Sequence, residues 1–518
     1  MKLVTSPQIS EIDTYAKNNL SLPMEELIAR AGRAVANAVR ARVQSGGRVV
    51  ILAGRGNNGA DGYAAALELI KEYEVVVYDV LKAGQKSEAG RSFLEAFCAA
   101  GGKLLPLTEE EEARMDLGSA DCIVDAIFGT GLRGEIPDNL RRLAKAVKAA
   151  VSAQKIAVDV PLGVNADDGS VTEDAIYVGA TVELSFVKVG ILSYPARSFV
   201  GDIVLDDLGL PIAELEQVFS FPNRLIEKKW VRDHLPKREE NSHKGTFGSL
   251  MMITGSETYR GAAALSMESA LRGGVGLLRY YGTPALCKEL AARFPETIYE
   301  KTAATEVLSS EEIASLCEAS KKHAATLVGC GSGQSEGLEA LVRALMDTEG
   351  GPLVLDADAI NALALHREEG VAAIKAAKRT VILTPHPMEF SRLSGYTISK
   401  VQHHRIESAR AFAKECGCIL VLKGAGTLVT DGDVLYINHT GSSALAKAGS
   451  GDVLAGFLAS LVASGAKPIH ASALAPYFHG RAADTLAKEF SSFGVIPSDL
   501  PMQIARELST FQNAAEEI

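Results

Sequence analysis

The sequence has few of the features that mark secreted, zinc-binding or membrane-spanning chains. It contains seven cysteines and one tryptophan in 518 residues. The only close cysteine pair, Cys416 and Cys418, is separated by one residue, unlike the spacing of zinc sites and thioredoxin motifs. No stretch of about 18 uninterrupted apolar residues occurs, and the first residues lack a basic region followed by an apolar run. We therefore expect a cytoplasmic protein without a membrane partner.

Basic charge is also scarce relative to acidic charge. The chain has 53 Lys and Arg residues against 64 Asp and Glu, which gives a formal net charge of -11 at pH 7. Nucleic acids and anionic membranes bind basic surfaces, so neither is an expected partner. The composition, 47% hydrophobic and 23% charged, is ordinary for a globular chain, but the length is too great for one core. We expect two or three domains and a small-molecule substrate.

What the chain does have is a regular alternation of short β-branched runs, glycine-rich turns and helical segments, which predicts parallel sheets. Strands are expected in the first half at residues 48–52, 75–80, 122–127, 156–160 and 181–186, with helices such as 25–39 and 62–72. The pattern lapses over residues 210–244, which marks the domain junction. Strands are expected again at residues 249–253, 327–329, 353–355, 380–383 and 418–422. Both halves are therefore of the α/β class.

The turns after the strands of the first half are rich in polar side chains. Ligands of open α/β sheets bind beyond the carboxyl ends of the strands, so these turns are candidate sites. The first turn, AGRGNNGADG at residues 53–62, lacks GxGxxG spacing, and its asparagines and Asp61 favour a loop that coordinates a cation or polar ligand groups through oxygen. Asp125 and Asp159 each end a further strand. Carboxylates that merely cap neighbouring turns are the alternative.

The string AGSGDVLAG, residues 448–456, is the most informative motif of the second half. Glycines around Ser450 leave the N-H groups of a helix start open to anionic oxygens, and the helix dipole favours negative charge there. A carboxylate at Asp452 is out of place unless it has a role, such as the general base of a phosphoryl transfer. The alternative is an ordinary helix cap, because Asp is a favoured N-cap residue.

Four other segments of the second half carry candidate groups. VGCGSG (328–333) has alternating glycines that let a backbone pack against a ring or a phosphate, and VLDADAIN (354–361) puts two carboxylates at a strand end. His386 is held between Pro385 and Pro387, whose fixed φ positions the imidazole, which favours a ligand contact. LKGAGTLVTDG (422–432) suggests a nucleotide-binding hairpin, with a plain tight turn as the alternative.

The order of these segments resembles two known families. The series DADAIN, TPHP, LKGAGT and AGSGDVLAG, from Thr246 to the end, resembles the ADP-dependent NAD(P)H-hydrate dehydratases, which are ribokinase-like. ELIARAGRAVA, GNNGADG, VDAIFGTGL, VDVPLG and FVKVG resemble the NAD(P)H-hydrate epimerases. The resemblance implies a Rossmann-like three-layer α/β/α domain at residues 1–213, a linker at 214–244 and a ribokinase-like α/β domain at 245–518.

For the second half, the resemblance implies dehydration of the S form of hydrated NADH or NADPH. ADP phosphorylates the ring hydroxyl to give AMP, and phosphate then leaves as the double bond reforms. Asp452 would be the base at the hydrate, and magnesium is expected on the phosphates. The hydrate would contact Ala262, Gly331, His386 and Asp452. The nucleotide would contact Lys423, Gly424, Ala425, Gly426, Thr427, Gly449, Ser450 and Gly451.

For the first half, the resemblance implies interconversion of the R and S hydrates. Asp159 and Lys188 are the candidates for the proton transfers, and Asn58 and Asp125 for a potassium ion. The hydrate would contact Asn57, Asn58, Gly59, Ala60, Asp61, Gly129, Thr130, Gly131, Leu132, Arg133, Gly134, Glu135 and Asp159. Two positions differ from the usual pattern: Leu162 replaces a serine hydroxyl near the potassium ion, and Ala60 adds a methyl group where positive φ or close ligand contact is expected.

Two alternatives stay open from the sequence. The chain could be a ribokinase-like kinase of a vitamin alcohol, which would use the same anion-binding turn and Asp452. The second alternative is that the first half is a non-catalytic dinucleotide-binding or scaffolding module. The resemblance also implies a homo-oligomer, supported by apolar surface on helices of the first half.

Overall fold

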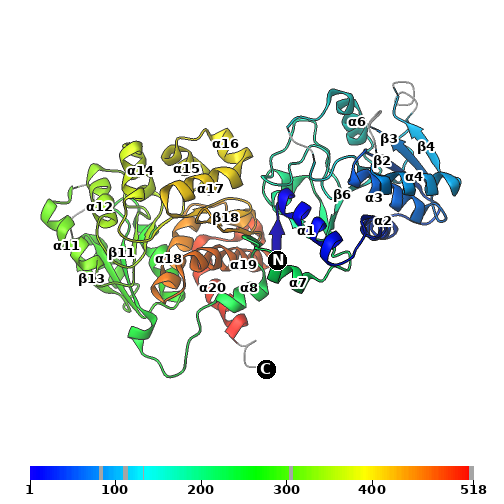
Figure 1. Ribbon diagram of the computed structural model, residues 1–518. Helices are drawn as coiled ribbons and strands as arrows, with labels where there is room; N and C mark the ends of the chain where they lie inside the picture. Colours follow the sequence, from blue (N-terminus) through cyan, green and yellow to red (C-terminus); the bar gives the residue numbers. More distant parts are fainter. Residues whose placement is uncertain (81–85, 109–114, 132–133, 303–306, 513–518) are drawn as a thin grey trace. The chain divides into compact units, whose positions relative to one another are not determined.

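The computed structural model of the chain describes residues 1–80, 86–108, 115–131, 134–302 and 307–512. It divides into two compact units (Figure 1). The N-terminal unit comprises residues 2–223 and 403–406, and the C-terminal unit comprises Met1, 224–402 and 407–518. The segment expected as a linker is not extended: it holds most of α7 (Ile212–Val218), together with β10 (Asn223–Leu225) and α8 (Lys228–His234).

A parallel sheet forms the centre of the N-terminal unit, in the strand order β4-β3-β2-β5-β6-β7-β9. Its strands are β2 (Arg48–Ala53), β3 (Glu74–Asp79), β4 (Lys103–Pro106), β5 (Cys122–Ala126), β6 (Gln154–Val158), β7 (Ala180–Leu184) and β9 (Asp202–Asp206). Outside this seven-stranded sheet, β1 (Lys2–Val4) pairs in parallel with β8 (Val187–Lys188). The five expected strands are confirmed; β4 and β9 were missed because both are partly exposed edge strands without a continuous apolar run.

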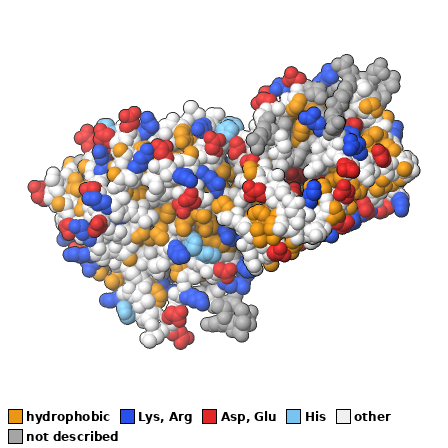
Figure 2. Space-filling model, in the orientation of Figure 1, with side chains coloured by type: hydrophobic (Ala, Val, Ile, Leu, Met, Phe, Trp, Pro, Cys, Tyr) orange, Lys and Arg blue, Asp and Glu red, His pale blue; other side chains and the backbone are white. Residues whose placement is uncertain are grey.

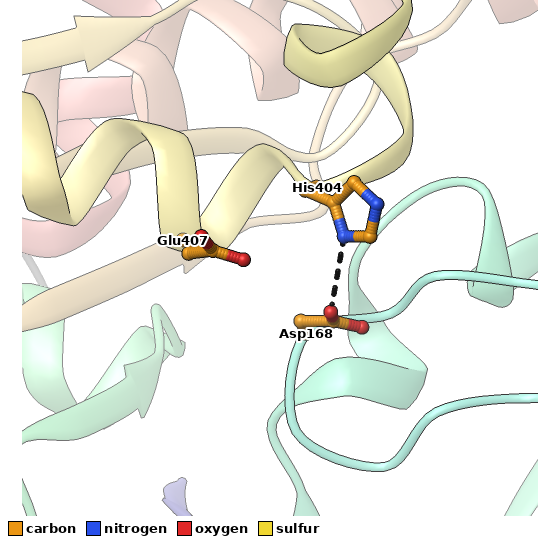
Figure 3. A group of neighbouring side chains, drawn as sticks. All are labelled: Asp168, His404 and Glu407. Carbon is orange, nitrogen blue, oxygen red and sulfur yellow. Dashed lines mark hydrogen bonds and ion pairs between the residues drawn. The ribbon is translucent and has the colours of Figure 1, made fainter. Parts of the chain in front are cut away.

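Helices cover both faces of this sheet, so the unit has three layers. The helices of the unit are α1 (Ser6–Asn19), α2 (Met24–Arg40), α3 (Asn57–Leu69), α4 (Glu88–Ala99), α6 (Asp138–Ala149), α7, η1 (Gly190–Leu192) and η2 (Ala196–Ser198). Val49 and Ile51 pack toward α2 and α3, whereas Val50 and Leu52 pack toward α6. This alternation follows the period of two in a strand. In the segment 403–406, His404 Nδ1 lies 3.2 Å from Asp168 Oδ2 (Figure 3).

The C-terminal unit is built on a longer sheet, ordered β13-β12-β11-β14-β15-β16-β17-β18-β19. Its strands are β11 (Ser249–Ile253), β12 (Leu277–Gly282), β13 (Ile298–Lys301), β14 (Ala325–Val328), β15 (Leu353–Leu355), β16 (Val381–Leu383), β17 (Ile419–Leu422), β18 (Thr427–Thr430) and β19 (Leu435–Asn438). Pairing is parallel from β13 to β17 and antiparallel from β17 to β19. The strand order reverses between β11 and β14, which is where ligands bind in such sheets.

The C-terminal helices form two groups (Figure 1). One group packs on a single face of the sheet and comprises α8, α9 (Arg260–Arg272), α18 (Ser450–Ala463), α19 (Pro468–Gly494) and α20 (Leu500–Gln512). The second comprises α11 (Ser310–Ser320), α12 (Glu336–Met346), α13 (Asp358–Leu365), α14 (Arg367–Lys375), α15 (Pro387–Ser394), α16 (Ile398–His403) and α17 (Arg405–Cys416). Shorter elements are η3 (Lys244–Phe247), α10 (Pro284–Ala291), η5 (Ser443–Leu445) and η6 (Pro497–Asp499).

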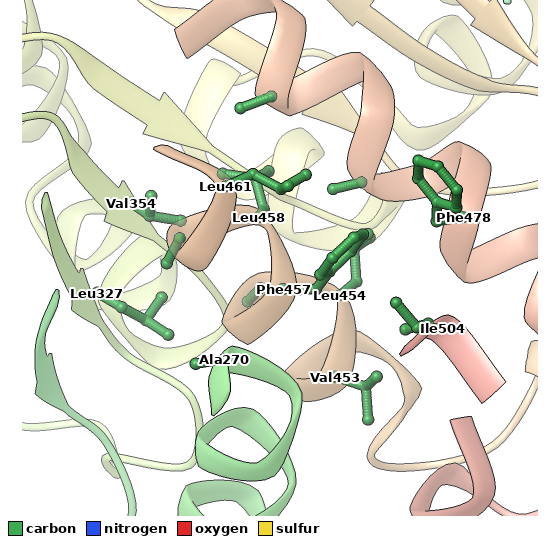
Figure 4. Close-up of a cluster of buried hydrophobic side chains, with 14 of the residues drawn as sticks. Ala270, Leu327, Val354, Val453, Leu454, Phe457, Leu458, Leu461, Phe478 and Ile504 are labelled. Atoms are coloured by element: carbon green, nitrogen blue, oxygen red, sulfur yellow. The ribbon is translucent and has the colours of Figure 1, made fainter. Parts of the chain in front are cut away.

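The core of the C-terminal unit lies between its sheet and α18. Leu327 and Val354 of the sheet pack with Phe457 and Leu458 of α18, and Phe478 of α19 joins them (Figure 4). Nearly all of α18 is buried beyond its first turn, which fixes the helix start at the carboxyl edge of the sheet. The position of the AGSGD turn is therefore set by burial of apolar side chains.

Figure 2 shows acidic and basic side chains interspersed on the face in view. Within the part of the chain that the structure describes, no helix is both long enough and apolar enough to cross a bilayer.

Candidate functional site

In the C-terminal unit, Asp452 lies at the start of α18, directly beside the glycine turn. It is the third residue of the helix, and the N-cap is Gly449, whose φ of 100° is left-handed and favours glycine. The alternative of an Asp452 N-cap is therefore wrong. Burial raises the pKa of Asp452 to about 7, and the Asp356 carboxylate adds to this rise, whereas Lys423 opposes it. A carboxyl that titrates near neutrality is suited to general base catalysis.

Lys423 and Asp356 form a buried ion pair at the same edge. Lys423 Nζ donates to Asp356 Oδ1 at 2.8 Å, and Thr384 Oγ1 donates to the same oxygen at 2.7 Å. Burial alone would lower the pKa of Lys423, but the carboxylates of Asp356 and Glu389 outweigh burial and raise it. A Cβ added to Gly451 would lie 3.3 Å from Lys423 Nζ, so the lysine also lies beside the helix start. A fixed cation there suits a phosphate ligand.

Cys330 is a buried member of this group that the sequence analysis did not single out. Its Sγ lies 3.6 Å from Asp356 Oδ2, and its thiol, Asp356 and Asp452 offer ligand atoms within 4.8 Å of one another. Gly329 permits the backbone before Cys330 to approach the backbone of Asp356, because a Cβ at Gly329 would lie 2.1 Å from the Asp356 carbonyl oxygen. The alternating glycines of VGCGSG drew attention to the turn, but nothing in the spacing indicated where the thiol would point.

Two buried polar atoms, one in the anion-binding turn and one on α19, have no hydrogen-bond partner within the described residues. These atoms are Ser450 Oγ and His479 Nε2. Burial lowers the pKa of His479 to about 4, so its imidazole is neutral near pH 7. Unsatisfied buried groups are costly, which points to a ligand at this helix start. His479 lies on α19, far along the chain from the motif, and was not predicted.

His386 caps a helix and also faces the site. Its Nδ1 accepts from the backbone N-H groups of Met388 at 3.1 Å and Glu389 at 3.3 Å, so it is the N-cap of α15. Burial lowers the pKa of His386, and Lys423 lowers it further. The neutral ring with Nδ1 as acceptor carries its proton on Nε2, which lies 3.3 Å from Glu389 Oε1.

The remaining predicted residues of this half lie at the same edge. A Cβ on Gly331 would lie 2.6 Å from Ala262 Cβ, so these two positions are in contact at the sheet reversal. Gly424, Ala425 and Gly426 form the turn between β17 and β18, and Thr427 opens β18. Antiparallel pairing of these strands shows that this segment is a β-hairpin.

In the N-terminal unit, a cavity of about 430 Å³ lies at the carboxyl ends of β2 and β5. Predicted residues that line it are Asn57, Asn58, Asp61, Gly129, Thr130, Gly131, Asp159 and Lys188. The helix α3 begins at Asn57 rather than at Gly62 as expected, so the GNNGADG segment forms its first turns. The start of a helix thus faces the cavity.

Lys188 is buried between two carboxylates. Its Nζ pairs with Asp159 and lies 3.3 Å from Glu183 Oε2. Burial alone would lower the pKa of Lys188, but Asp159 and Glu183 outweigh it and raise the pKa. Burial raises the pKa of Glu183 to about 8. Lys188 therefore keeps its proton and acts as a fixed cation beside Asp159. Glu183 was missed because it lies within β7, where a carboxylate has no sequence signature.

Other predicted residues of this half lie away from the cavity or outside the described residues. Ala60 has ordinary helical φ and packs against Ala64 and Ala89, so of the two expectations for this position, positive φ or close ligand contact, the first does not hold. Gly134 and Glu135 are exposed and are not part of the cavity lining. Leu132 and Arg133 lie outside the described residues.

Asp125 is buried behind the cavity and is held by backbone donors. Its Oδ2 accepts from Leu162 N at 2.7 Å, and its Oδ1 accepts from Ile127 N at 3.2 Å. Burial raises the pKa of Asp125 to about 6. The Leu162 side chain is buried in the core under α6 and offers no oxygen. A Cβ on Gly129 would lie 3.3 Å from Asn58 Oδ1 and 2.7 Å from Asp159 Oδ2, so glycine keeps both oxygens accessible.

Comparison with known proteins identifies relatives of both halves. Residues 24–190 match the family described as YjeF-related protein N-terminus, and residues 250–506 match the family described as NAD(P)H-hydrate dehydratase. The protein named Bifunctional NAD(P)H-hydrate repair enzyme Nnr from Moorella thermoacetica is 34% identical over 511 residues, covering 96% of this chain and 95% of that one. The protein of that name from Coxiella burnetii is 32% identical, covering 96% and 97%.

Solved structures also match part of the chain. The ADP/ATP-dependent NAD(P)H-hydrate dehydratase from Bacillus subtilis, co-crystallised with ATP and Mg²⁺, is 29% identical with a TM-score of 0.48. The match covers 55% of this chain and 97% of the Bacillus subtilis chain.

Proposed function

The chain belongs to the bifunctional NAD(P)H-hydrate repair enzymes, and from this premise we propose which residues carry out each of the two reactions. The enzyme interconverts the R and S hydrates of NADH and NADPH and dehydrates the S form with ADP. The vitamin-kinase alternative loses its support, because both halves align with bifunctional relatives over nearly the whole chain. The N-terminal unit is assigned to epimerisation and the C-terminal unit to dehydration.

Dehydration is assigned to the group around Asp452. The hydrate hydroxyl attacks the β-phosphorus of ADP, the bond to the α-phosphate breaks to release AMP, and Asp452 takes the hydroxyl proton. Lys423 and the N-H groups around Gly451 neutralise the transferring phosphate, with Ser450 Oγ and His479 as further donors. The carboxyl of Asp452, titrating near neutrality beside an anion-binding helix start, is the observation that carries this assignment.

Magnesium is proposed to bind mainly through the nucleotide phosphates. Asp356 is already engaged by Lys423 and Thr384, and Cys330 offers sulfur where Mg²⁺ prefers oxygen. The ion would shield phosphate charge, while the proton transfer belongs to Asp452. Hydrated NADH supplied with ADP tests the assignment: the reduced-nicotinamide absorbance should recover as AMP appears, and Asp452→Asn should abolish both signals. Recovery without AMP would contradict it.

Epimerisation is assigned to the cavity lined by Asp159 and Lys188. Asn57, Asp61 and residues 129–131 are proposed to contact the hydrate there. Potassium is proposed to bind Asn58 Oδ1 and Asp125, which supply an amide and a carboxylate oxygen. We also propose that the protein is cytoplasmic and forms a homo-oligomer. Exposed Val151, Tyr177 and Val218 on the N-terminal unit support the homo-oligomer. Light scattering of the purified chain tests its oligomeric state.

A further inference from the structure

One carboxylate of the epimerase cavity comes from an element that no motif includes. Asp13 lies on α1 and lines the cavity together with Asp61, Asp159 and Lys188. Ile9, one helical turn before Asp13, lines the same cavity, and the buried Ile12 and Ala16 anchor the helix in the core. The helix therefore presents Asp13 to the cavity from a fixed position.

The partners and the charges around the Asp13 carboxyl suit it to donating and accepting a proton. No hydrogen bond or ion pair engages its carboxylate within the described residues. Burial raises its pKa to about 6; Lys188 opposes this rise and Asp159 adds to it. On α3, Asp61 also faces the cavity, and burial raises its pKa well above the usual value. Arg55 is a further charged residue of the cavity lining.

The reaction needs two proton-transfer groups. Hydration of an enamine places the hydroxyl on the carbon next to the ring nitrogen, so inversion can proceed by loss and return of water. An acid protonates the hydroxyl, the C-O bond breaks as water leaves, and the nitrogen lone pair forms a C=N⁺ bond. Water then adds to the opposite face, the lone pair returns to nitrogen, and a base takes the water proton. One proton is given and one is taken, so charge balances.

We propose that Asp13 is the second catalytic acid/base group of the epimerase, acting from α1 while Asp159 acts from the turn after β6. Asp159, which pairs with Lys188, serves as base when Asp13 serves as acid, and the roles reverse in the opposite direction. This inference rests on the proposed epimerase function of the N-terminal unit.

The test uses the full-length protein with R-hydrate, ADP and Mg²⁺. Asp13→Asn should slow conversion of the R form at least roughly 100-fold, toward its spontaneous rate, while dehydration of the S form is unchanged. Glu11→Gln, an exposed carboxylate on the same helix, is the matched control and should behave as the wild type. In a parallel assay without ADP, wild-type conversion of R-hydrate should also incorporate ¹⁸O from labelled water into the S-hydrate, and Asp13→Asn should lose this incorporation.

The outcomes separate this inference from the function on which it rests. A wild-type protein that dehydrates S-hydrate without speeding R-hydrate conversion would overturn the epimerase function itself. If the wild type speeds conversion and Asp13→Asn does so equally, only the role of Asp13 is overturned. Asp13→Glu keeps a carboxyl on α1 and should recover part of the activity. A folded Asp13→Glu variant as slow as Asp13→Asn would also overturn it.

Discussion

Lys423 Nζ donates a 2.8 Å hydrogen bond to Asp356 Oδ1, joining the turn after β17 to the turn after β15. The pair is largely buried, with side-chain exposures of 18% and 2%. Removing one partner leaves an uncompensated buried charge, which costs more than the pair itself contributes. Lys423→Met should therefore lower the free energy of unfolding by roughly 3 kcal/mol and also raise the KM for ADP. Denaturant unfolding and steady-state kinetics measure the two effects.

A double variant separates the two roles of Lys423. Asp356→Asn removes the charge that Lys423→Met leaves unpaired, so the double variant should recover most of the lost stability. Its KM for ADP should stay high, because the cation beside Gly451 is still absent. If the double variant binds ADP as the wild type does, Lys423 has only a structural role.

The pH dependence of dehydration should report Asp452. Its carboxyl has a pKa of about 7 and must be ionised to accept a proton. The kcat/KM for S-hydrate should thus rise as pH increases through about 7 and level off above it, and Asp452→Asn should lower kcat by roughly 100-fold or more. Dehydration that is independent of pH between 6 and 8 would contradict the assignment.

The free energy of unfolding should fall with rising pH because of Asp452, whereas the dehydration rate should rise. A carboxyl whose folded pKa is raised destabilises the fold as pH rises from its unfolded value to its folded value, because the charged form is disfavoured in the folded state. Asp452→Asn should therefore be more stable than the wild type, and the difference should grow by roughly 1 kcal/mol between pH 6 and pH 8. Denaturant unfolding at both values measures it. If the difference in the free energy of unfolding between the variant and the wild type is the same at both pH values, the pKa of Asp452 is not raised in the folded protein.

The sequence predicted well those elements whose signal is local. Every strand it expected is present, because buried parallel strands are continuous apolar runs. The exposed strands β4, β9 and β13 lack that run and were missed. The start of α3 was placed late, because its first turns are glycine and asparagine, which favour loops.

The candidate sites divide in the same way. Asp452, Lys423 and His386 belong to short motifs and were predicted from the sequence. His479, Glu183 and Asp13 reach the sites only through tertiary packing, because each lies on an element whose own residues carry no signal of a site. Cys330 lies in the VGCGSG turn, which the glycines did indicate, but the direction of its thiol is set by tertiary packing. Leu162 was read as a lost oxygen donor, and the structure adds that its backbone N-H holds Asp125.

His386 should be separable into a capping role and a substrate role. His386→Asn keeps a side-chain acceptor at the N-cap but removes the Nε2 donor, whereas His386→Ala removes both. Both variants should raise the KM for S-hydrate. Only His386→Ala should also lose about 1 kcal/mol of stability, measured by denaturant unfolding. Equal stability loss in both variants would show that capping depends on the imidazole itself.

Replacing potassium should affect only the epimerase. If Asn58 Oδ1 and Asp125 hold the ion, R-hydrate conversion should slow when KCl is replaced by choline chloride at equal ionic strength, while S-hydrate dehydration continues unchanged. Asn58→Ala should remove this potassium response, because one of two side-chain oxygens is lost. Asn57→Ala, on the same helix turn but exposed, should keep the response and change only substrate affinity. Leu162→Ser restores a hydroxyl beside Asp125 and should lower the potassium concentration needed for half-maximal rate. R-hydrate conversion that is equally fast in choline chloride would mean that these two oxygens bind no catalytically required ion.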